Sequence, residues 1–292
     1  MSDPLIRLLT PADLDDAVTL SSTAGWNQQR EDWRMLQTLA PRGSFAAIGE
    51  GRIVGTSIGI DYGHFGWIAM MLVEPAYRGR GVGRRLLEAA MAAVPSDRPI
   101  RLDATPMGRP LYQAFGFEDE SMLTRYVAPA AARRVPPHPG GLSTETLTEA
   151  SLPAIVKHDG GIFGADRRAV LDWALHRAPD YARVTRSDAG LARYCFGRLG
   201  RRFDQVGPVV ADDDEAARAL VAAALAGAED RAVAIDAFDA RNGFTAWLRA
   251  IGFDAERPLF RMRRRGTHAP PVPGGEDPVP LVEFAILGPD FG

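Results

Sequence analysis

The chain has 292 residues, of which 46% are hydrophobic and 24% charged, so it can bury enough apolar surface for two domains and is not a disordered chain. Its formal net charge of −3 argues against a nucleic-acid partner, because such proteins usually carry a strongly basic surface. No apolar run approaches the ~20 residues that span a bilayer, and no signal peptide is recognisable. We therefore expect a cytoplasmic protein without a membrane partner.

The single cysteine excludes an internal disulfide and leaves no metal-ligand spacing, so no metal is expected. Cys195 lies between Tyr194 and Phe196. Apolar and aromatic neighbours favour a buried structural thiol over a nucleophile.

The first 128 residues predict a mixed sheet with helices. A strand at 6–9 is followed by a helix that begins at Thr10, with Pro11 at its first position. Glycines at 49 and 51 predict a hairpin turn between two strands. The other strands are expected at 44–48, 52–60, 67–73, 100–104 and 122–127, and the other helices at 30–39, 84–94 and 111–114.

The second half repeats this pattern weakly. Residues 129–141 are rich in proline and alanine and predict a linker. Beyond them we expect strands at 203–211, 232–236 and 281–286, helical segments at 212–228 and 242–253, and a proline-rich stretch at 269–280. Residues 247–253 align with residues 111–117, which indicates a duplicated fold. The predicted fold class is α/β with mixed sheets, in two domains at 1–128 and 142–292.

The sequence from Arg78 to Gly83 has the form of an anion-binding turn. It follows an apolar strand and precedes an amphipathic helix. Glycine lets backbone N–H groups approach a ligand closely, and the N-terminus of a helix favours a phosphate. The arginines add forked donors that suit phosphate oxygens. The alternative is an ordinary strand–loop–helix turn with a solvated basic edge.

Two motifs together carry a family resemblance. Arg78–Gly83 reads R-x-x-G-x-G, and Leu111–Phe117 reads L-Y-x-x-x-G-F. In this order and with these flanks, the chain resembles the GNAT superfamily of acetyl-CoA-dependent N-acetyltransferases, in the bacterial tandem-domain form. The resemblance covers nearly the whole chain, although only the motifs of the first domain are specific. It implies two GNAT-like domains, each a twisted mixed sheet flanked by helices.

The resemblance also implies direct acetyl transfer from acetyl-CoA to an amine. Residues implied to bind the pyrophosphate are Arg78, Gly79, Arg80, Gly81, Val82, Gly83 and Arg84. Leu72 and Val73 would offer backbone hydrogen bonds to the pantetheine in the manner of an added strand. Tyr112 matches the tyrosine that protonates the leaving thiolate, since a phenol with a pKa of ~10 stays protonated at neutral pH. The alternative for Tyr112 is a core aromatic.

The general base and the acceptor site are less defined by the sequence. Glu74, at the end of the central strand, is the first candidate base, and Asp61, His64 and Asp103 are others. Each of these is also explained as a surface or hydrogen-bonding residue. Candidates for acceptor binding are Trp26, Asn27 and Asp166, with a hydrophobic staple as the alternative for Trp26 and a helix cap as the alternative for Asp166.

The second copy lacks the residues of the first that suit the cofactor. Its counterpart of the glycine-rich turn is the acidic stretch Val209–Glu215, which would repel a pyrophosphate. Leu248 occupies the position of Tyr112. We therefore expect no acetyl-CoA in the second domain, which would form a wall of the acceptor pocket or stabilise the first domain.

The leading functional hypothesis is an N-acetyltransferase for the amine of a small metabolite, acting as a monomer or homodimer. One alternative is a non-catalytic acyl-CoA sensor or interaction module on the same scaffold. Another is a protein or peptide amine acetyltransferase, which would need an open groove.

Overall fold

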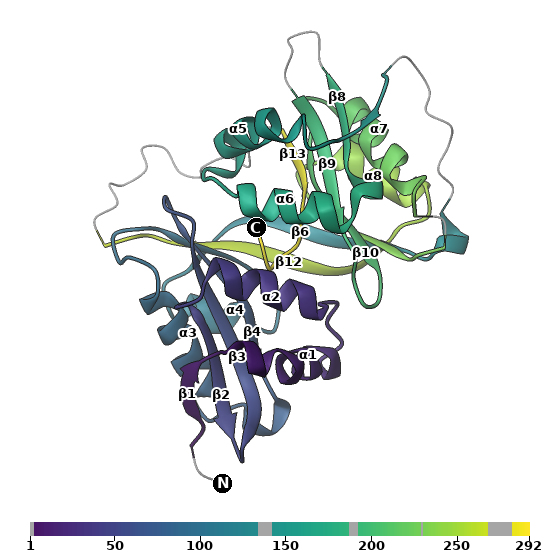
Figure 1. Cartoon of the computed structure of the whole chain (residues 1–292). Coiled ribbons are helices and arrows are strands. Elements are labelled where there is room, and N and C mark those ends of the chain that lie inside the picture. Colours follow the sequence, from purple (N-terminus) through teal and green to yellow (C-terminus); the bar gives the residue numbers. More distant parts are fainter. Residues whose placement is uncertain (1–2, 134–141, 187–191, 229, 268–281) are drawn as a thin grey trace.

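The computed structural model describes residues 3–133, 142–186, 192–228, 230–267 and 282–292. Most of the expected linker, residues 134–141, and the proline-rich stretch 269–280 lie outside the described residues. The described strands form one continuous thirteen-stranded sheet that runs through both halves of the chain (Figure 1). Its order is β1-β2-β3-β4-β5-β12-β6-β11-β13-β10-β9-β8-β7.

The N-terminal half closely follows the predicted order of elements. Its strands are β1 (Leu5–Leu8), β2 (Ser44–Gly49), β3 (Arg52–Asp61), β4 (Gly66–Val73), β5 (Ile100–Ala104) and β6 (Glu118–Ala128). Its helices are α1 (Leu14–Thr23), α2 (Arg30–Leu39), α3 (Val82–Ala92) and α4 (Arg109–Gln113), with short 3₁₀ turns at Pro11–Asp13, Pro75–Tyr77 and Ala130–Ala132. Helices α1 and α2 cover one face of the sheet, and α3 and α4 cover the other (Figure 1).

The C-terminal half has the same layered form. Its strands are β7 (Glu145–Thr146), β8 (Arg183–Arg186), β9 (Ala192–Arg198), β10 (Asp204–Val210), β11 (Val233–Phe238), β12 (Asp254–Arg264) and β13 (Glu283–Ile286). Its helices are α5 (Leu152–Phe163), α6 (Arg168–Arg177), α7 (Asp214–Leu225) and α8 (Asn242–Ala250), with a 3₁₀ turn at Pro179–Tyr181. The acidic start of α7 acts as a cap, because the Asp213 carboxylate accepts a 2.7 Å hydrogen bond from the amide of Ala216.

The two halves exchange a strand at the centre of the sheet. Strand β12 belongs to the C-terminal half but lies between β5 and β6, antiparallel to both. Strand β6 pairs on its other edge with β11. Two bidentate ion pairs cross this junction: Arg261 of β12 binds Asp103 of β5, and Arg125 of β6 binds Asp236 of β11. The halves are therefore joined by backbone pairing as well as by side chains.

Each half contains one pair of parallel strands that begin side by side and then separate. Strands β4 and β5 pair only at Gly66–Trp67 with Ile100–Arg101. Strands β10 and β11 pair only at Asp204–Gln205 with Val233–Ala234. Such a splay leaves backbone edges open to another chain or a ligand.

The aligned motifs at 111–117 and 247–253 have the same local structure, as predicted. In each, a glycine in the left-handed conformation follows the helix: Gly116 has φ +79° and Gly252 has φ +98°. The amide of Phe117 donates to the carbonyl of Tyr112 (3.1 Å), and that of Phe253 donates to the carbonyl of Leu248 (3.0 Å). Leu248 therefore occupies the place of Tyr112, and it is fully buried.

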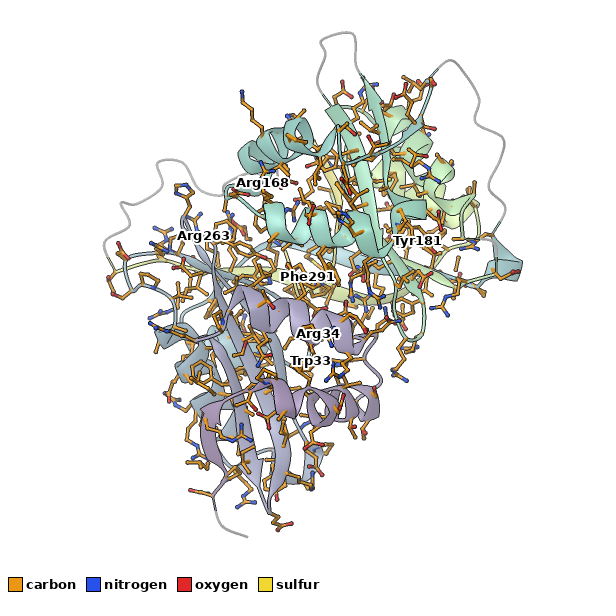
Figure 2. All side chains as sticks on the ribbon, in the orientation of Figure 1. Trp33, Arg34, Arg168, Tyr181, Arg263 and Phe291 are labelled. Atoms are coloured by element: carbon orange, nitrogen blue, oxygen red, sulfur yellow. The ribbon has the colours of Figure 1, made fainter. Side chains whose placement is uncertain are left out.

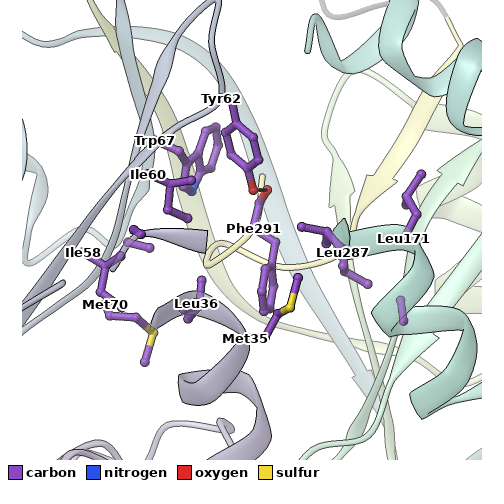
Figure 3. Close-up of a cluster of buried hydrophobic side chains, with 14 of the residues drawn as sticks. Met35, Leu36, Ile58, Ile60, Tyr62, Trp67, Met70, Leu171, Leu287 and Phe291 are labelled. Carbon is purple, nitrogen blue, oxygen red and sulfur yellow. Dashed lines mark hydrogen bonds between the residues drawn. The ribbon is translucent and has the colours of Figure 1, made fainter. Parts of the chain in front are cut away.

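One hydrophobic core spans both halves. It joins apolar residues of α2, β3 and β4 to residues of α5, α6 and β9, and the C-terminal segment 287–292 runs between them (Figure 3). Phe291 is fully buried, and its carbonyl accepts a hydrogen bond from the Tyr62 hydroxyl. Figure 2 shows Phe291 between the two halves. As expected, Cys195 is also buried, and burial raises the pKa of its thiol to about 12.

Candidate active site

A cavity of about 250 Å³ lies in the splay between β4 and β5. Its N-terminal wall is formed by residues of the α1–α2 loop, β4, the β5–α4 segment and β6, namely Gly25, Trp26, Asn27, Gln28, Ile68, Ala69, Met70, Met71, Asp103, Thr105, Gly108, Tyr112 and Arg125. The C-terminal half supplies Arg202, Phe203, Glu256, Arg257, Leu259, Pro289 and Asp290. The cavity therefore depends on both halves of the chain.

Strand β4 has a bulge where it borders the cavity. Two of its residues, Met70 and Met71, face the single residue Ser57 of β3. Met70 has φ +52°, a left-handed conformation that costs a residue with a side chain ~1–2 kcal/mol. A bulge leaves a backbone residue outside the strand ladder, and bulges are frequent beside active sites.

Tyr112 is positioned at the cavity by the short helix α4. Its ring packs edge-on against Phe117, with 5.9 Å between ring centres. Within the described chain its hydroxyl makes no hydrogen bond, and the side chain lines the cavity. Burial raises the pKa of the Tyr112 phenol further above its ordinary value. The hydroxyl is thus protonated at neutral pH and free to donate a hydrogen bond to a ligand.

The glycine-rich turn from 78 to 83 precedes α3, as predicted, but the helix begins at Val82 rather than near Arg84. Gly79 and Gly81 have φ values of +72° and +75°, and the space beside each is open. Gly81 is the N-cap, so the amides of residues 81–84 lack partners inside the helix. This geometry suits an anion, because several N–H groups converge at the positive end of the helix.

The basic side chains of this turn are held by local contacts. Arg78 donates to the Val73 carbonyl, which ties the end of β4 to the turn. Arg80 lies over the ring of Tyr77, and Arg84 lies over the ring of Phe115. From Ile68 onward, β4 has no partner strand on its β5 side among the described strands, so its backbone offers an edge there, although the Val73 carbonyl is already bound by Arg78.

Trp26 and Asn27 both reach the cavity, but the amide of Asn27 is already engaged. Its nitrogen donates to the Phe203 carbonyl (2.9 Å), and its oxygen accepts from the amides of Arg202 and Phe203. Asn27 therefore holds the β9–β10 loop of the second half against the first. Trp26 is partly buried beside it.

Among the predicted catalytic and acceptor-binding residues, Glu74 and Asp166 do not line this cavity. Glu74 forms a bidentate ion pair with Arg52 at the surface, and that contact lowers the pKa of its carboxyl. Asp166 is exposed and accepts a hydrogen bond from the amide of Arg168, the first residue of α6 (2.8 Å), although the N-cap position itself is Arg167. Asp166 borders a separate surface pocket together with His64.

Of the other candidate bases, only Asp103 reaches the cavity. Its carboxylate is bound by both nitrogens of the Arg261 fork, at 2.9 and 3.0 Å. Asp61 is paired with Arg98. Burial raises the pKa of the Asp103 carboxyl in spite of the nearby Arg261 charge, but both of its oxygens are already engaged by the Arg261 fork, so neither is free to bind an amine.

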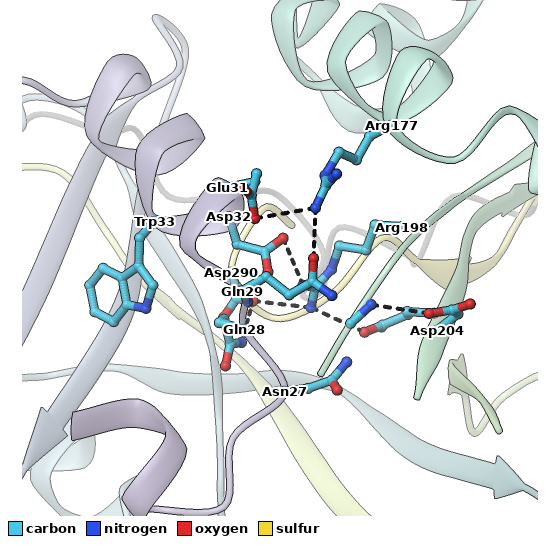
Figure 4. Close-up of polar contacts among 12 residues, drawn as sticks. Asn27, Gln28, Gln29, Glu31, Asp32, Trp33, Arg177, Arg198, Asp204 and Asp290 are labelled. Carbon is cyan, nitrogen blue, oxygen red and sulfur yellow. Dashed lines mark hydrogen bonds and ion pairs between the residues drawn. The ribbon is translucent and has the colours of Figure 1, made fainter. Parts of the chain in front are cut away.

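Asp290 is a cavity carboxylate that the sequence did not reveal. It lies in the C-terminal segment that crosses from β13 back to the first half, and it is 5% exposed. Its Oδ2 accepts from Gln28 (2.6 Å) and from Arg198 (3.3 Å), as Figure 4 shows. Arg198 also pairs with Asp32 at 3.0 Å. Among the described contacts, Oδ1 of Asp290 has no hydrogen-bond partner.

The corresponding splay in the second half is filled by the chain itself. Strand β13 lies between β10 and β11, antiparallel to both. A Cβ on Gly207 would lie 1.9 Å from the carbonyl oxygen of Ile286, so only glycine at 207 admits this strand. The edges that are open in the first half are thus covered in the second.

Neither a metal site nor a membrane span is evident in the described ranges. They contain no group of three or more His, Cys, Asp and Glu residues that could hold a metal ion. The helices observed there are too short or too polar to cross a bilayer.

Comparison with known families identifies the class of protein. Two family models, both described as an acetyltransferase (GNAT) domain, match residues 41–119 and 155–273. The chain belongs to the GNAT superfamily, carries two GNAT domains in tandem, and is an acyltransferase enzyme. This confirms the resemblance and the fold class predicted from the sequence.

Individual relatives agree with this assignment. The uncharacterized N-acetyltransferase YitH of Bacillus subtilis is 25% identical over 231 residues, which cover 77% of this chain and 79% of the relative. The structure of a Pyrococcus horikoshii protein assigned as an acetyltransferase is 25% identical, covers 100% of this chain and 97% of that chain, and has a TM-score of 0.73. A tandem GNAT protein from the clavulanic acid biosynthesis pathway shares the fold, with 16% identity, a TM-score of 0.64, and coverage of 92% of this chain and 100% of that chain.

Proposed function

We propose that this enzyme transfers an acetyl group from acetyl-CoA directly to the amine of a small metabolite. The observation that carries the proposal is the open splay of the first half, which ends in a cavity bordered by the unpartnered hydroxyl of Tyr112. A pantetheine arm would add to the edge of β4 at Leu72 and Val73, as an extra strand does, and would replace Arg78 at the Val73 carbonyl. Its pyrophosphate would bind the amides and arginines of residues 78–84.

In the proposed reaction the amine attacks the acetyl carbonyl, and the thiolate of coenzyme A leaves. Tyr112 donates its phenolic proton to that thiolate, which needs a positioned acid of high pKa. We propose that Asp290, instead of Glu74, receives the proton of the amine through its free Oδ1 or through water. The supporting observation is position, since Asp290 lines the cavity and Glu74 is bound to Arg52 at the surface.

The small volume of the cavity favours a small acceptor over a protein or peptide. Its walls include Phe203, Leu259 and Pro289 from the C-terminal half, and its volume is only about 250 Å³. That value lies just below the usual range of small-molecule sites, which is about 300–1,000 Å³. The second domain thus forms a wall of the acceptor pocket in this proposal, and its own splay is occupied by β13.

Titration calorimetry of the full chain with acetyl-CoA tests the cofactor assignment. We expect a single site per chain, because one splay is open and the other is filled by residues 283–286. Two sites per chain would contradict the assignment to the first half alone. Absence of binding would contradict the proposed function.

A glycine substitution tests where the cofactor binds. We expect Gly81→Ala to weaken acetyl-CoA binding by about 10- to 100-fold, which corresponds to the loss of one charge-assisted hydrogen bond. Gly51→Ala is the matched control, because Gly51 has the same strained backbone (φ +77°, against +75° for Gly81) and open space around it, but lies in the β2–β3 turn. Both variants should lose a similar ~1–2 kcal/mol of unfolding free energy in urea titrations. Equal affinity for acetyl-CoA in the two variants would argue against the loop.

A further inference from the structure

Arg257 is an arginine of the cavity wall that has no partner of its own. It lies on β12 and lines the cavity, and its Nε is buried without a hydrogen bond. Among the described residues, no ion pair or hydrogen bond involves its guanidinium. The residue as a whole is half-buried, and a cation that is partly removed from water without a counter-ion costs free energy, so such a group is normally paired with an anion.

A second arginine, Arg125, makes it more costly in free energy to leave Arg257 without a counter-ion. Arg257 of β12 lies directly opposite Arg125 of β6 in the antiparallel ladder. Like charges at directly opposed positions destabilise a sheet. The nearby carboxylate of Asp236 is used by Arg125, through two 2.7 Å hydrogen bonds. Burial, together with the charge of Arg125, lowers the pKa of Arg257.

The other charged groups that line the cavity do not pair with Arg257. Arg202 already binds the Gly25 carbonyl (3.1 Å) and Glu256 (3.5 Å). Glu256 and Asp290 lie near enough to attract Arg257, but neither forms an ion pair with it. Among the residues that the structure describes, the wall therefore presents Arg257 as a cation without a partner and, beside it, carboxylates that suit an amine. Such a pattern is complementary to a ligand with both charges.

The pyrophosphate of the cofactor is not the missing anion. Residues 78–84, which form the proposed pyrophosphate site, do not border the cavity. Arg257 instead shares the cavity with Tyr112, the proposed acid at the reacting thioester. An anion that reaches Arg257 therefore belongs to the acceptor.

We propose that the acceptor is a small amino acid, and that Arg257 binds its carboxylate while its amine faces the acetyl group. This inference rests on the proposed acetyltransferase function. The forked guanidinium suits a carboxylate because it donates two parallel hydrogen bonds. The small volume of the cavity limits the acceptor to a compact molecule.

The test compares α-amino acids with their α-carboxamides as acceptors for the full chain with acetyl-CoA, by the rate of thiol release. We expect the enzyme to prefer the acid over the amide by about 10- to 100-fold in kcat/KM, as charge-assisted hydrogen bonds usually provide. In Arg257→Gln, KM for the acid should rise by about the same factor with little change in kcat, and the amide should be unaffected. Arg257→Lys should restore part of the preference, because it keeps the charge without the fork.

Two controls separate this inference from the proposed function. Arg34→Gln removes an exposed arginine of α2 away from the cavity and should change neither acceptor. Calorimetry with acetyl-CoA should give the same affinity for Arg257→Gln as for the unmodified chain, which shows that the variant is folded. Three results would overturn the inference. One is that the enzyme acetylates acids and amides equally well, and another is that its preference for the acid survives Arg257→Gln. The third is a chain that binds acetyl-CoA but acetylates neither the amino acids nor their amides. Failure to bind acetyl-CoA would overturn the proposed function and the inference with it.

Discussion

Replacing Tyr112 by phenylalanine is expected to lower kcat by about 10²–10⁴-fold, which is the usual contribution of a positioned general acid. The ring would remain in the core against Phe117, so the fold and the affinity for acetyl-CoA should not change. The physical reason is that the departing thiolate then lacks a positioned proton donor. Steady-state thiol release and calorimetry with acetyl-CoA measure the two quantities.

Tyr77→Phe is the matched control for this prediction. Tyr77 is 1% exposed, and its hydroxyl is buried without a hydrogen-bond partner in the described residues, so its loss removes no hydrogen bond. Both variants delete one phenolic oxygen from a buried ring, but only Tyr112 lines the cavity. An equal fall in kcat in both variants, or none in Tyr112→Phe, would remove the acid assignment.

The direction of the Tyr112 pKa predicts the pH dependence of the reaction. Burial raises the pKa above the usual ~10 of a phenol, so the donor form persists throughout the neutral and mildly alkaline range. The acid should therefore impose no decline in kcat below about pH 10, whereas deprotonation of the amine makes the rate increase with pH. A decline centred near neutral pH would indicate a different acid.

Local sequence signals predicted the elements of the first half well. Helix α2 and strand β5 have the predicted boundaries, Arg30–Leu39 and Ile100–Ala104. Both depend on nearby residues, because amphipathic spacing and turn residues act within a few positions. The paired glycines at 116 and 252 show the same point, since each ends a short helix in the conformation that glycine favours.

Strand β12 was not predicted, because its burial comes from paired charges and not from an apolar pattern. It contains Pro258 and several arginines, which weaken a strand signal. Arg261 nevertheless lies at the centre of the sheet, where Asp103 of a distant strand neutralises it. The exchange of β12 into the first half depends on partners more than 100 residues away, which no local pattern encodes.

The residues of the candidate site show the same difference between local motifs and long-range contacts. The glycine-rich turn and Tyr112 belong to contiguous motifs, so they could be proposed from the sequence. Arg257 and Asp290 have no motif around them, and they reach the cavity only because β12 is exchanged and residues 287–292 cross between the halves. Glu74 looked suitable because it ends the central strand, but its neighbour across the hairpin, Arg52, binds it at the surface.

The ion pair between Arg125 and Asp236 is expected to give the largest effect on stability. It links β6 to β11 across the two halves, and Asp236 is fully buried. Arg125 and its hydrogen bonds lower the pKa of Asp236, although burial alone would raise it. Asp236→Leu should therefore reduce the free energy of unfolding by about 3–5 kcal/mol, because it leaves Arg125 buried without a counter-ion opposite Arg257.

A double-mutant cycle separates two contributions to the free energy of unfolding: the stabilisation by the Arg125–Asp236 pair, and the destabilisation by a buried charge that has lost its partner. Urea unfolding would be measured for Asp236→Leu, Arg125→Met and both together. We expect the double variant to be more stable than Asp236→Leu, because a buried pair replaced by apolar groups of similar size often loses little stability. It should also relieve the repulsion on Arg257, since Arg125 is the nearest like charge in the ladder. Additive losses in the cycle would mean that the two side chains stabilise the junction independently, and that the charge of Arg125 is not what makes Asp236 necessary.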